Sequence, residues 1–231
     1  MRDFVIAFAS VYLSGIRGYY RLQSIFDRFR KQSVPNSIYQ SPRKLNLGSS
    51  DRLIPTYTNA DALEERSPDI VCDIRKLNFA ADNEYDLVRA SHVLEHFALE
   101  EIPDILSEWR RVLKVGGYLI VCVPNYVALS WRAVLKPSGF SLDKETYQNG
   151  WINGVFALDL PPQYRHKIVF TYDSLSTLLA NSGFKVIGRL SCRVEEPFTL
   201  GIKDDSCDPF SMNIAARKVQ ETPPQGVGKV S

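Results

Sequence analysis

The feature that most constrains the fold is a regular alternation between residues 44 and 123. Five short apolar segments follow one another there, separated by turns and by one amphipathic helix pattern. Alternating strands and helices are typical of a parallel sheet with helices on its faces. The first segment ends in Gly48-Ser49-Ser50, small residues that let backbone N–H groups approach a ligand closely. Ligands of such sheets bind at the carboxyl ends of the strands, so we expect a binding site beside this turn.

Apolar periodicity extends the prediction along the chain. It predicts strands at residues 44–48, 56–61, 69–73, 85–90, 118–123, 184–194 and 211–217, and helices at residues 4–31, 102–113 and 171–182. The helix over 102–113 has the clearest apolar face, formed by Ile102, Ile105, Leu106, Trp109, Val112 and Leu113. Gly116-Gly117 is expected to end that helix. Thr171 or Asp173 is expected to cap the last helix, with Gly183 just past its end.

These elements divide the chain into three parts. Residues 1–43 form an N-terminal amphipathic helix and a linker, residues 44–218 form the main domain, and residues 219–231 form a disordered tail. Within the main domain, residues 126–170 are rich in aromatic side chains and lack periodicity, which favours an irregular insertion acting as a lid. The N-terminal helix is basic. It packs on the main domain or on a second copy in a homodimer, or it lies on a membrane surface.

Charge and cysteine content exclude several classes of protein. The chain has 28 Lys+Arg against 26 Asp+Glu, a net charge of +2, which leaves no basic footprint for nucleic acid. No apolar run reaches the roughly 18 residues of a transmembrane helix. Asp3 and the missing polar break before a cleavage site argue against a signal peptide. The four cysteines are far apart and form no Cys-x-x-Cys pair, so we expect a cytoplasmic protein with reduced thiols.

Three aspartates stand at the boundaries of the predicted strands. Asp61 and Asp73 end the second and third strands, and Asp86 lies at the head of the fourth. An acid at the end of the second strand of a nucleotide-binding sheet accepts hydrogen bonds from ribose hydroxyls, and Asp73 could accept one from an adenine amine. Strand-end aspartates also initiate turns and cap helices. Two of them in succession after a glycine turn favour the ligand-binding interpretation.

Residues 44–125 resemble a class I S-adenosylmethionine-dependent methyltransferase, close to the methyltransferase type 11 group. The matching motifs are Leu45-Asn46-Leu47-Gly48, Asn59-Ala60-Asp61, Asp69-Ile70-Val71-Cys72-Asp73, Tyr85-Asp86-Leu87-Val88, His92-Val93-Leu94-Glu95-His96-Phe97 and Glu108-Trp109-Arg110-Arg111-Val112-Leu113-Lys114-Val115-Gly116-Gly117. His166-Lys167, Ser174-Leu175 and Asn181-Ser182-Gly183-Phe184 are similar to the end of such domains.

The resemblance implies a Rossmann-like α/β fold, with a seven-stranded, mostly parallel sheet whose last strand is antiparallel. It implies methyl transfer from S-adenosylmethionine to a small-molecule acceptor, and the resemblance alone suggests that this acceptor is a sugar or glycan precursor. The residues that it assigns to the cofactor are Gly48 and Ser49 at the methionine part, Asp61 at the ribose, Asp73 and Ile74 beside the adenine, and Ser91 along the cofactor.

The sequence departs from the family pattern in two places. Ser50 stands where the family usually has a second glycine. If that position needs a positive φ, a non-glycine residue there costs about 1–2 kcal/mol. A catalytically silent methyltransferase-like binding protein is therefore the alternative function. The connections at residues 49–55 and 62–68 are also shorter than the dozen residues of a usual parallel crossover.

The histidines supply the catalytic candidates. His92, Glu95 and His96 match H-x-x-E-H, a zinc motif of one metallopeptidase group, but no third ligand is evident in the sequence, so we expect no metal. Methyl transfer to oxygen or nitrogen often needs a base, and imidazole has a suitable pKa. His96 is a structural residue or a general base. His166 is a base, a substrate ligand or a surface residue, and we take His96 and His166 as the catalytic candidates.

Overall fold

A computed structural model describes residues 35–135, 156–157, 161–190, 200–201 and 211–220 of the chain. The described residues belong to one compact unit, Val34–Ser231. The helix predicted at residues 4–31, the middle of the predicted lid and the tail from residue 221 lie outside them. In the described residues no helix combines the length and the apolar character needed to cross a membrane.

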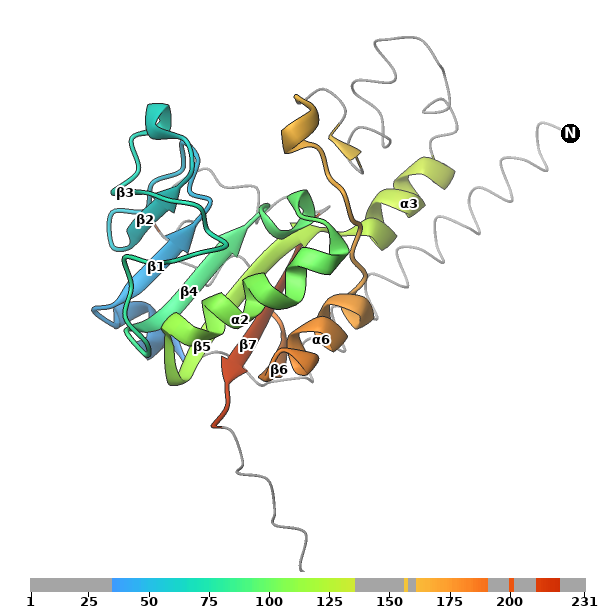
Figure 1. The fold of residues 1–231 in the computed structure, drawn as a ribbon. Coiled ribbons are helices and arrows are strands. Elements are labelled where there is room, and N and C mark those ends of the chain that lie inside the picture. The colour runs from blue at the N-terminus through green and yellow to red at the C-terminus, as the bar shows by residue number, and fades with distance from the viewer. Residues whose placement is uncertain (1–34, 136–155, 158–160, 191–199, 202–210, 221–231) are drawn as a thin grey trace, which may run out of the picture. The chain divides into compact units, whose positions relative to one another are not determined.

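The core of the fold is a seven-stranded sheet in the order β3-β2-β1-β4-β5-β7-β6 (Figure 1). Its strands are β1 Lys44–Leu47, β2 Thr58–Asp61, β3 Ile70–Val71, β4 Tyr85–Ser91, β5 Leu113–Pro124, β6 Phe184–Arg189 and β7 Ser211–Lys218. β1 pairs in parallel with both β2 and β4, β4 pairs in parallel with β5, and β7 is antiparallel to both of its neighbours. The predicted fold class, a mostly parallel sheet with an antiparallel last strand, is confirmed.

Two of the α-helices cover one face of the sheet (Figure 1). The α-helices are α2 Ile102–Val112, α3 Tyr126–Leu135 and α6 Tyr172–Asn181, and single 3-10 turns are η1 Asn36–Gln40, η2 Glu64–Arg66, η3 Leu94–His96, η4 Leu99–Glu101 and η6 Pro162–Tyr164. α2 and α6 bury their apolar sides in the main core. As predicted, Thr171 caps α6 by accepting from the Ser174 N–H at 3.2 Å, and Gly183 follows α6 with φ +80°.

The opposite face of the sheet is packed differently because the short connections contain no α-helix. Residues 48–57, between β1 and β2, form only turns, and η2 is the one helical turn between β2 and β3. A second cluster of buried side chains forms on that face, made of Tyr39, Ile54, Tyr57, Leu87, Ile120 and Ala215. Tyr39 comes from η1, so the described part of the predicted linker packs on the sheet through this residue. Pro35 precedes a 3-10 turn whose tyrosine packs under the sheet.

Several element boundaries differ from the sequence prediction. Gly116 and Gly117 do not end a helix but lie inside β5, where the pairing with β4 jumps from Leu113 to Tyr118. Gly116 has φ +83°, so this glycine accommodates the irregularity. The predicted irregular insertion begins with the regular helix α3. β3 shrinks to two residues, because the segment at 69–73 pairs with β2 over only two positions.

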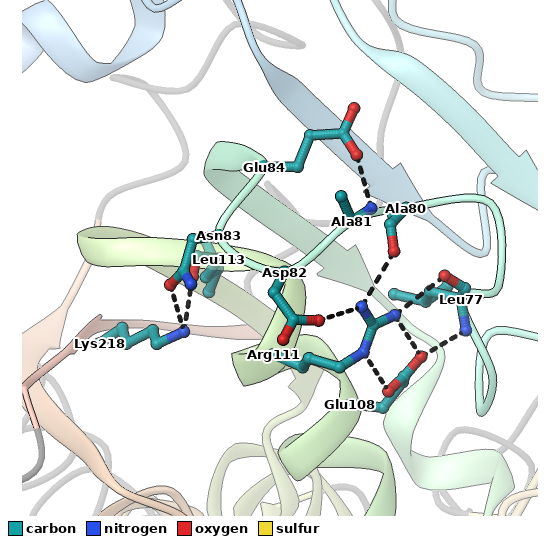
Figure 2. A network of polar contacts seen from close by, with 10 residues as sticks. All are labelled: Leu77, Ala80, Ala81, Asp82, Asn83, Glu84, Glu108, Arg111, Leu113 and Lys218. Atoms are coloured by element: carbon teal, nitrogen blue, oxygen red, sulfur yellow. Dashed lines mark hydrogen bonds and ion pairs between the residues drawn. The ribbon is translucent and has the colours of Figure 1, made fainter.

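A polar network fixes the long connection between β3 and β4 to α2 (Figure 2). The Arg111 guanidinium donates to both carboxylate oxygens of Glu108 at 2.9 Å, to Asp82 Oδ1 at 2.7 Å and to the carbonyls of Ala80 at 2.9 Å and Leu77 at 3.0 Å. Glu108 Oε1 also accepts from the Leu77 N–H at 2.7 Å. One arginine thus satisfies carbonyls of a loop that lacks a helix of its own.

Candidate functional site

The turn after β1 is shaped by Gly48. Its φ is +64°, and a Cβ added there would lie 2.0 Å from Val93 Cγ2, so a side chain at this position would meet Val93. The N–H groups of Gly48 and Ser49 both donate to the Ala60 carbonyl, at 2.8 and 3.2 Å. These two N–H groups are therefore engaged with the end of β2 and do not point at a ligand as free donors.

Ser50 occupies a left-handed conformation. Its φ is +48°, so the condition under which a non-glycine residue is strained is met. The Ser50 N–H donates to Asp61 Oδ2 at 2.7 Å, and Asp61 Oδ1 accepts from the Leu63 N–H at 2.9 Å. The strained turn and the carboxylate at the end of β2 thus form one unit. A carboxylate has about four acceptor positions, so Asp61 keeps capacity for hydroxyl donors.

Two buried hydroxyl groups lie beside this turn. β1 and β4 pair in register with Leu47 opposite Ala90, which brings Ser49 and Ser91 to the same edge of the sheet. Neither Ser49 Oγ nor Ser91 Oγ has a hydrogen-bond partner among the described residues, although both atoms are buried. Buried hydroxyls are normally paired, so these two fit a site that a polar ligand completes.

The two residues predicted to flank the adenine, Asp73 and Ile74, differ in their exposure to solvent. Asp73 is half exposed, and its carboxylate accepts from Arg75 Nε and Nη2 at 2.9 and 2.8 Å. The hydrogen bond from Arg75 holds the pKa of Asp73 below its usual value. Ile74 is buried in the main core, and its carbonyl accepts from Trp109 Nε1 at 2.9 Å. Asp73 therefore faces solvent and Ile74 faces the core.

His92 is held in a strained and partly buried position at the end of β4. Its φ is +53°, and its N–H donates to the Cys122 carbonyl at 2.8 Å. Its Nε2 lies 2.9 Å from Ser211 Oγ and its Nδ1 lies 3.3 Å from Glu95 Oε1. Burial lowers the pKa of His92, but contacts with Cys122 and Glu95 outweigh burial, and the pKa lies well above its ordinary value.

The H-x-x-E-H motif does not adopt the geometry of a metallopeptidase. That geometry needs two histidines four residues apart on one face of an α-helix. Here His92 is in the left-handed region and only Leu94–His96 is helical, as the single turn η3. His92 points at Ser211 and does not belong to the group of side chains around His96. This geometry argues against the metallopeptidase alternative.

Glu95, His96 and His166 meet beside η3. Backbone hydrogen bonds draw the chain after His166 to η3, because the N–H groups of Lys167 and Ile168 donate to the Glu95 carbonyl at 2.8 and 3.4 Å. The imidazole rings of His96 and His166 are then 5.0 Å apart, edge to face. The structure thus brings the two predicted catalytic histidines together. One donor atom from each of the three side chains lies within 4.8 Å of the others, so this group can hold a metal ion.

Glu95 was not among the site residues predicted from the sequence. Its side chain is only 1% exposed, and neither carboxylate oxygen has a hydrogen-bond partner among the described residues. Burial raises the pKa of Glu95, but the three histidines around it lower it by more. An acid between Leu94 and His96 in an apolar stretch was the available signal. A shallow pocket next to this group is lined by His166, Tyr126, Leu129 and Phe170, among others.

The fold and the site define a class of protein, a Rossmann-like domain with a ligand turn after its first strand. A sequence profile of the family described as "Methyltransferase domain" matches residues 54–121. This match confirms the resemblance of the chain to S-adenosylmethionine-dependent methyltransferases of the type 11 group. The match begins after the Gly48 turn and ends before His166.

Solved structures agree with the fold. A protein of Pyrococcus horikoshii is 14% identical, has a TM-score of 0.52, and is covered over 90% of its length by 87% of this chain. A structure described as S-adenosylmethionine-dependent methyltransferases of Methanosarcina mazei is 19% identical with a TM-score of 0.50, over 78% of this chain and 93% of that one. No curated protein sequence matches significantly. At these identities the structures support the fold alone.

Proposed function

We propose that this protein transfers the methyl group of S-adenosylmethionine to a hydroxyl of a small molecule, and that the acceptor is a sugar or glycan precursor. The observation that carries the proposal is the edge where β1, β2 and β4 end. There a strained turn is bonded to Asp61, and two buried hydroxyls, Ser49 Oγ and Ser91 Oγ, lack partners among the described residues. A polar cofactor lying across these strand ends would satisfy them.

In this proposal each part of the cofactor has its own residues. Gly48 and Ser49 pass the methionine part, and the packing of Gly48 on Val93 fixes the path of the turn that carries them. Asp61 accepts from the ribose hydroxyls, Asp73 and Ile74 flank the adenine, and Ser91 lies along the cofactor. The exposure of Asp73 supports its role, since its carboxylate is accessible from solvent.

The acceptor lies on the other side of the methyl group, against His96 and His166. In the reaction the sulfonium methyl moves to the acceptor oxygen, S-adenosylhomocysteine leaves as a neutral thioether, and the hydroxyl loses its proton. We propose that the two histidines activate this hydroxyl. The larger part of the rate enhancement comes from aligning the oxygen with the methyl group, which needs no covalent enzyme intermediate.

One observation favours a second function, a catalytically silent binding protein. Ser50 has φ +48° where the family usually has glycine, so the turn is strained at the cofactor position. Ser50→Gly separates the two functions. If strain at the turn opposes binding, this variant binds S-adenosylmethionine more tightly than the natural protein. Ser67→Gly is the matched control, because Ser67 has φ +53° and lies in another loop.

The experiment is a methyl-transfer assay with labelled S-adenosylmethionine and a panel of sugar nucleotides and free sugars. We expect label in at least one sugar acceptor, and a loss of transfer in His166→Asn with cofactor binding retained. Transfer to non-sugar acceptors alone would contradict the acceptor class. Cofactor binding without transfer to any small molecule would favour the silent protein.

The remaining expectations about partners and location rest on less. We propose a cytoplasmic location, which the free thiols of Cys72 and Cys122 support because reduced cysteines are usual in the cytosol. A homodimer or a membrane contact through residues 4–31 stays a prediction from the sequence.

A further inference from the structure

We propose that Glu95, His96 and His166 form a binding site for a divalent transition-metal ion of the Zn²⁺ or Mn²⁺ type. Two imidazoles and one carboxylate are a common ligand set for such ions. The binding itself is independent of the proposed function. Its consequence for the acceptor rests on the proposed function.

The distances are compatible with a metal ion. One donor atom from each of the three side chains lies within 4.8 Å of the others, and His166 Nε2 is 3.9 Å from Glu95 Oε1. Bonds of about 2.1 Å in a tetrahedral Zn²⁺ site place donor atoms about 3.4 Å apart. The distance of 3.9 Å between His166 Nε2 and Glu95 Oε1 would need to shorten by about half an ångström to reach this spacing. Donor atoms at the 4.8 Å limit would need to approach by about 1.4 Å, so metal binding requires side-chain rotation at this site.

An independent observation points to a cation at this position. Glu95 is 1% exposed, and neither of its oxygens has a hydrogen-bond partner among the described residues. His96 Nδ1 is likewise buried without one in the part of the chain that the structure describes. Buried carboxylates in proteins are paired or coordinate metals, and the contact with His92 Nδ1 at 3.3 Å pairs Glu95 on one side only. A metal ion bound by Glu95 and His96 would supply a partner to both side chains.

His92 is not a ligand but supports one. Its Nδ1 is 3.3 Å from Glu95 Oε1, while its other nitrogen is 2.9 Å from Ser211 Oγ. Carboxylate ligands are commonly oriented by a donor behind them. Each carboxylate oxygen has about two acceptor positions, so the contact with His92 leaves Glu95 able to bind a metal ion. His92 also distinguishes this site from an H-x-x-E-H site, in which it would itself be a ligand.

Three protein ligands leave coordination positions for the acceptor. A narrow, mostly apolar pocket adjoins His166, and it would have to widen to admit an oxygen ligand of the metal. An acceptor with two neighbouring hydroxyls, as in a sugar, can bind through both oxygens. A bound dication lowers the pKa of a coordinated hydroxyl. The hydroxyl proton would pass to water, and the resulting alkoxide would take the methyl group. In this way the two histidines would activate the acceptor through the metal.

The test is calorimetric titration of the purified full chain with Zn²⁺ alone, after treatment with a chelator. We expect one site in the natural protein, and binding weakened at least about tenfold in Glu95→Gln, His96→Asn and His166→Asn. The chain has only three histidines. His92→Asn removes only the support behind Glu95 and should weaken binding less than the ligand variants, whereas Asp104→Asn, at an exposed position on α2, is the control that must keep the site. Unchanged affinity in His96→Asn and His166→Asn would overturn the proposal and indicate binding at thiols.

Two further measurements keep the result interpretable. Circular dichroism without metal shows whether each variant is folded, and Co²⁺ absorption bands report imidazole coordination directly. If Glu95→Gln does not fold, the two histidine variants decide the outcome. Methyl transfer is then measured with and without chelator. Full activity in the metal-free protein would overturn the metal's role in the reaction while leaving the proposed function intact, whereas failed cofactor binding would contradict the proposed function alone.

Discussion

Replacing Gly48 by alanine tests the packing of the cofactor turn most sharply. The added Cβ would lie 2.0 Å from Val93 Cγ2, and the residue would keep φ +64°. The left-handed conformation costs about 1–2 kcal/mol in a residue with a side chain. Overpacking a filled site costs about 1–3 kcal/mol. We therefore expect Gly48→Ala to lower the free energy of unfolding by about 3 kcal/mol.

A double-mutant cycle separates these two costs. Val93 is 8% exposed, and Val93→Ala alone should cost about 2 kcal/mol for the lost methyl groups. In the double variant the 2.0 Å contact disappears and the nearest Val93 atom is its Cβ at 3.3 Å, whereas the backbone cost stays. The double variant should then lose about 1–2 kcal/mol less than the sum of the single variants.

Equilibrium unfolding in urea measures the cycle. Trp109 is fully buried and provides a fluorescence signal, and far-ultraviolet circular dichroism provides a second probe. Strictly additive effects would show that Gly48 and Val93 do not compete for space. A natural level of stability in Gly48→Ala would show that the turn can adopt a conformation open to side chains, which would remove the reason for close approach to a ligand.

Three further predictions concern stability and reactivity. Arg111→Ala should lower the free energy of unfolding by about 2–4 kcal/mol, because it removes the cation that pairs with partly buried Glu108 and leaves two carbonyls without this donor. Arg43→Ala, at an exposed position, should cost less than about 1 kcal/mol, and equal effects in urea unfolding would refute this prediction. The hydrogen bond from Arg111 lowers the pKa of Glu108 in the folded protein. The stabilisation by ionised Glu108 is therefore complete above the pKa of this residue in the unfolded chain, and it is lost as the pH falls through its lower pKa in the folded protein. The difference in unfolding free energy between the natural protein and Glu108→Gln should therefore shrink in acid. Burial raises the pKa of Cys72 to about 11. Alkylation of this thiol, followed by mass spectrometry, should therefore be slow at neutral pH and accelerate above about pH 10. Fast modification at neutral pH would contradict this prediction.

The sequence predicted the sheet because its signals are local. Each strand is a short apolar run bounded by a turn residue, and the buried stripe of α2 repeats with helical spacing. The caps at Thr171 and Gly183 are likewise chemical requirements of a helix end. Such features depend only on residues close together in the sequence, so they can be predicted without knowledge of the tertiary structure. The left-handed conformation of Ser50 could also be anticipated, because the family usually has glycine at that position.

What the sequence did not reveal depends on contacts between distant segments. Glu95 becomes part of the site because His166, seventy-one positions later in the chain, is brought beside it by backbone hydrogen bonds. The segment around η1 has the proline and serine content of a linker, and nothing local indicated that Tyr39 packs under the sheet. Gly116 and Gly117 were placed at a helix end because a glycine pair has the same sequence signature in a bulged strand. In each case tertiary pairing decided the outcome.

Calorimetry with S-adenosylmethionine tests the central claim most directly. The natural protein should bind one equivalent of the cofactor, and Asp61→Asn should weaken binding by about tenfold or more, because a ribose acceptor and the anchor of the Ser50 turn are both changed. Asp104→Asn, an exposed position on α2, should bind like the natural protein. Undetectable binding at millimolar cofactor, or equal affinity in Asp61→Asn and Asp104→Asn, would contradict the assignment of the cofactor to the ends of β1, β2 and β4.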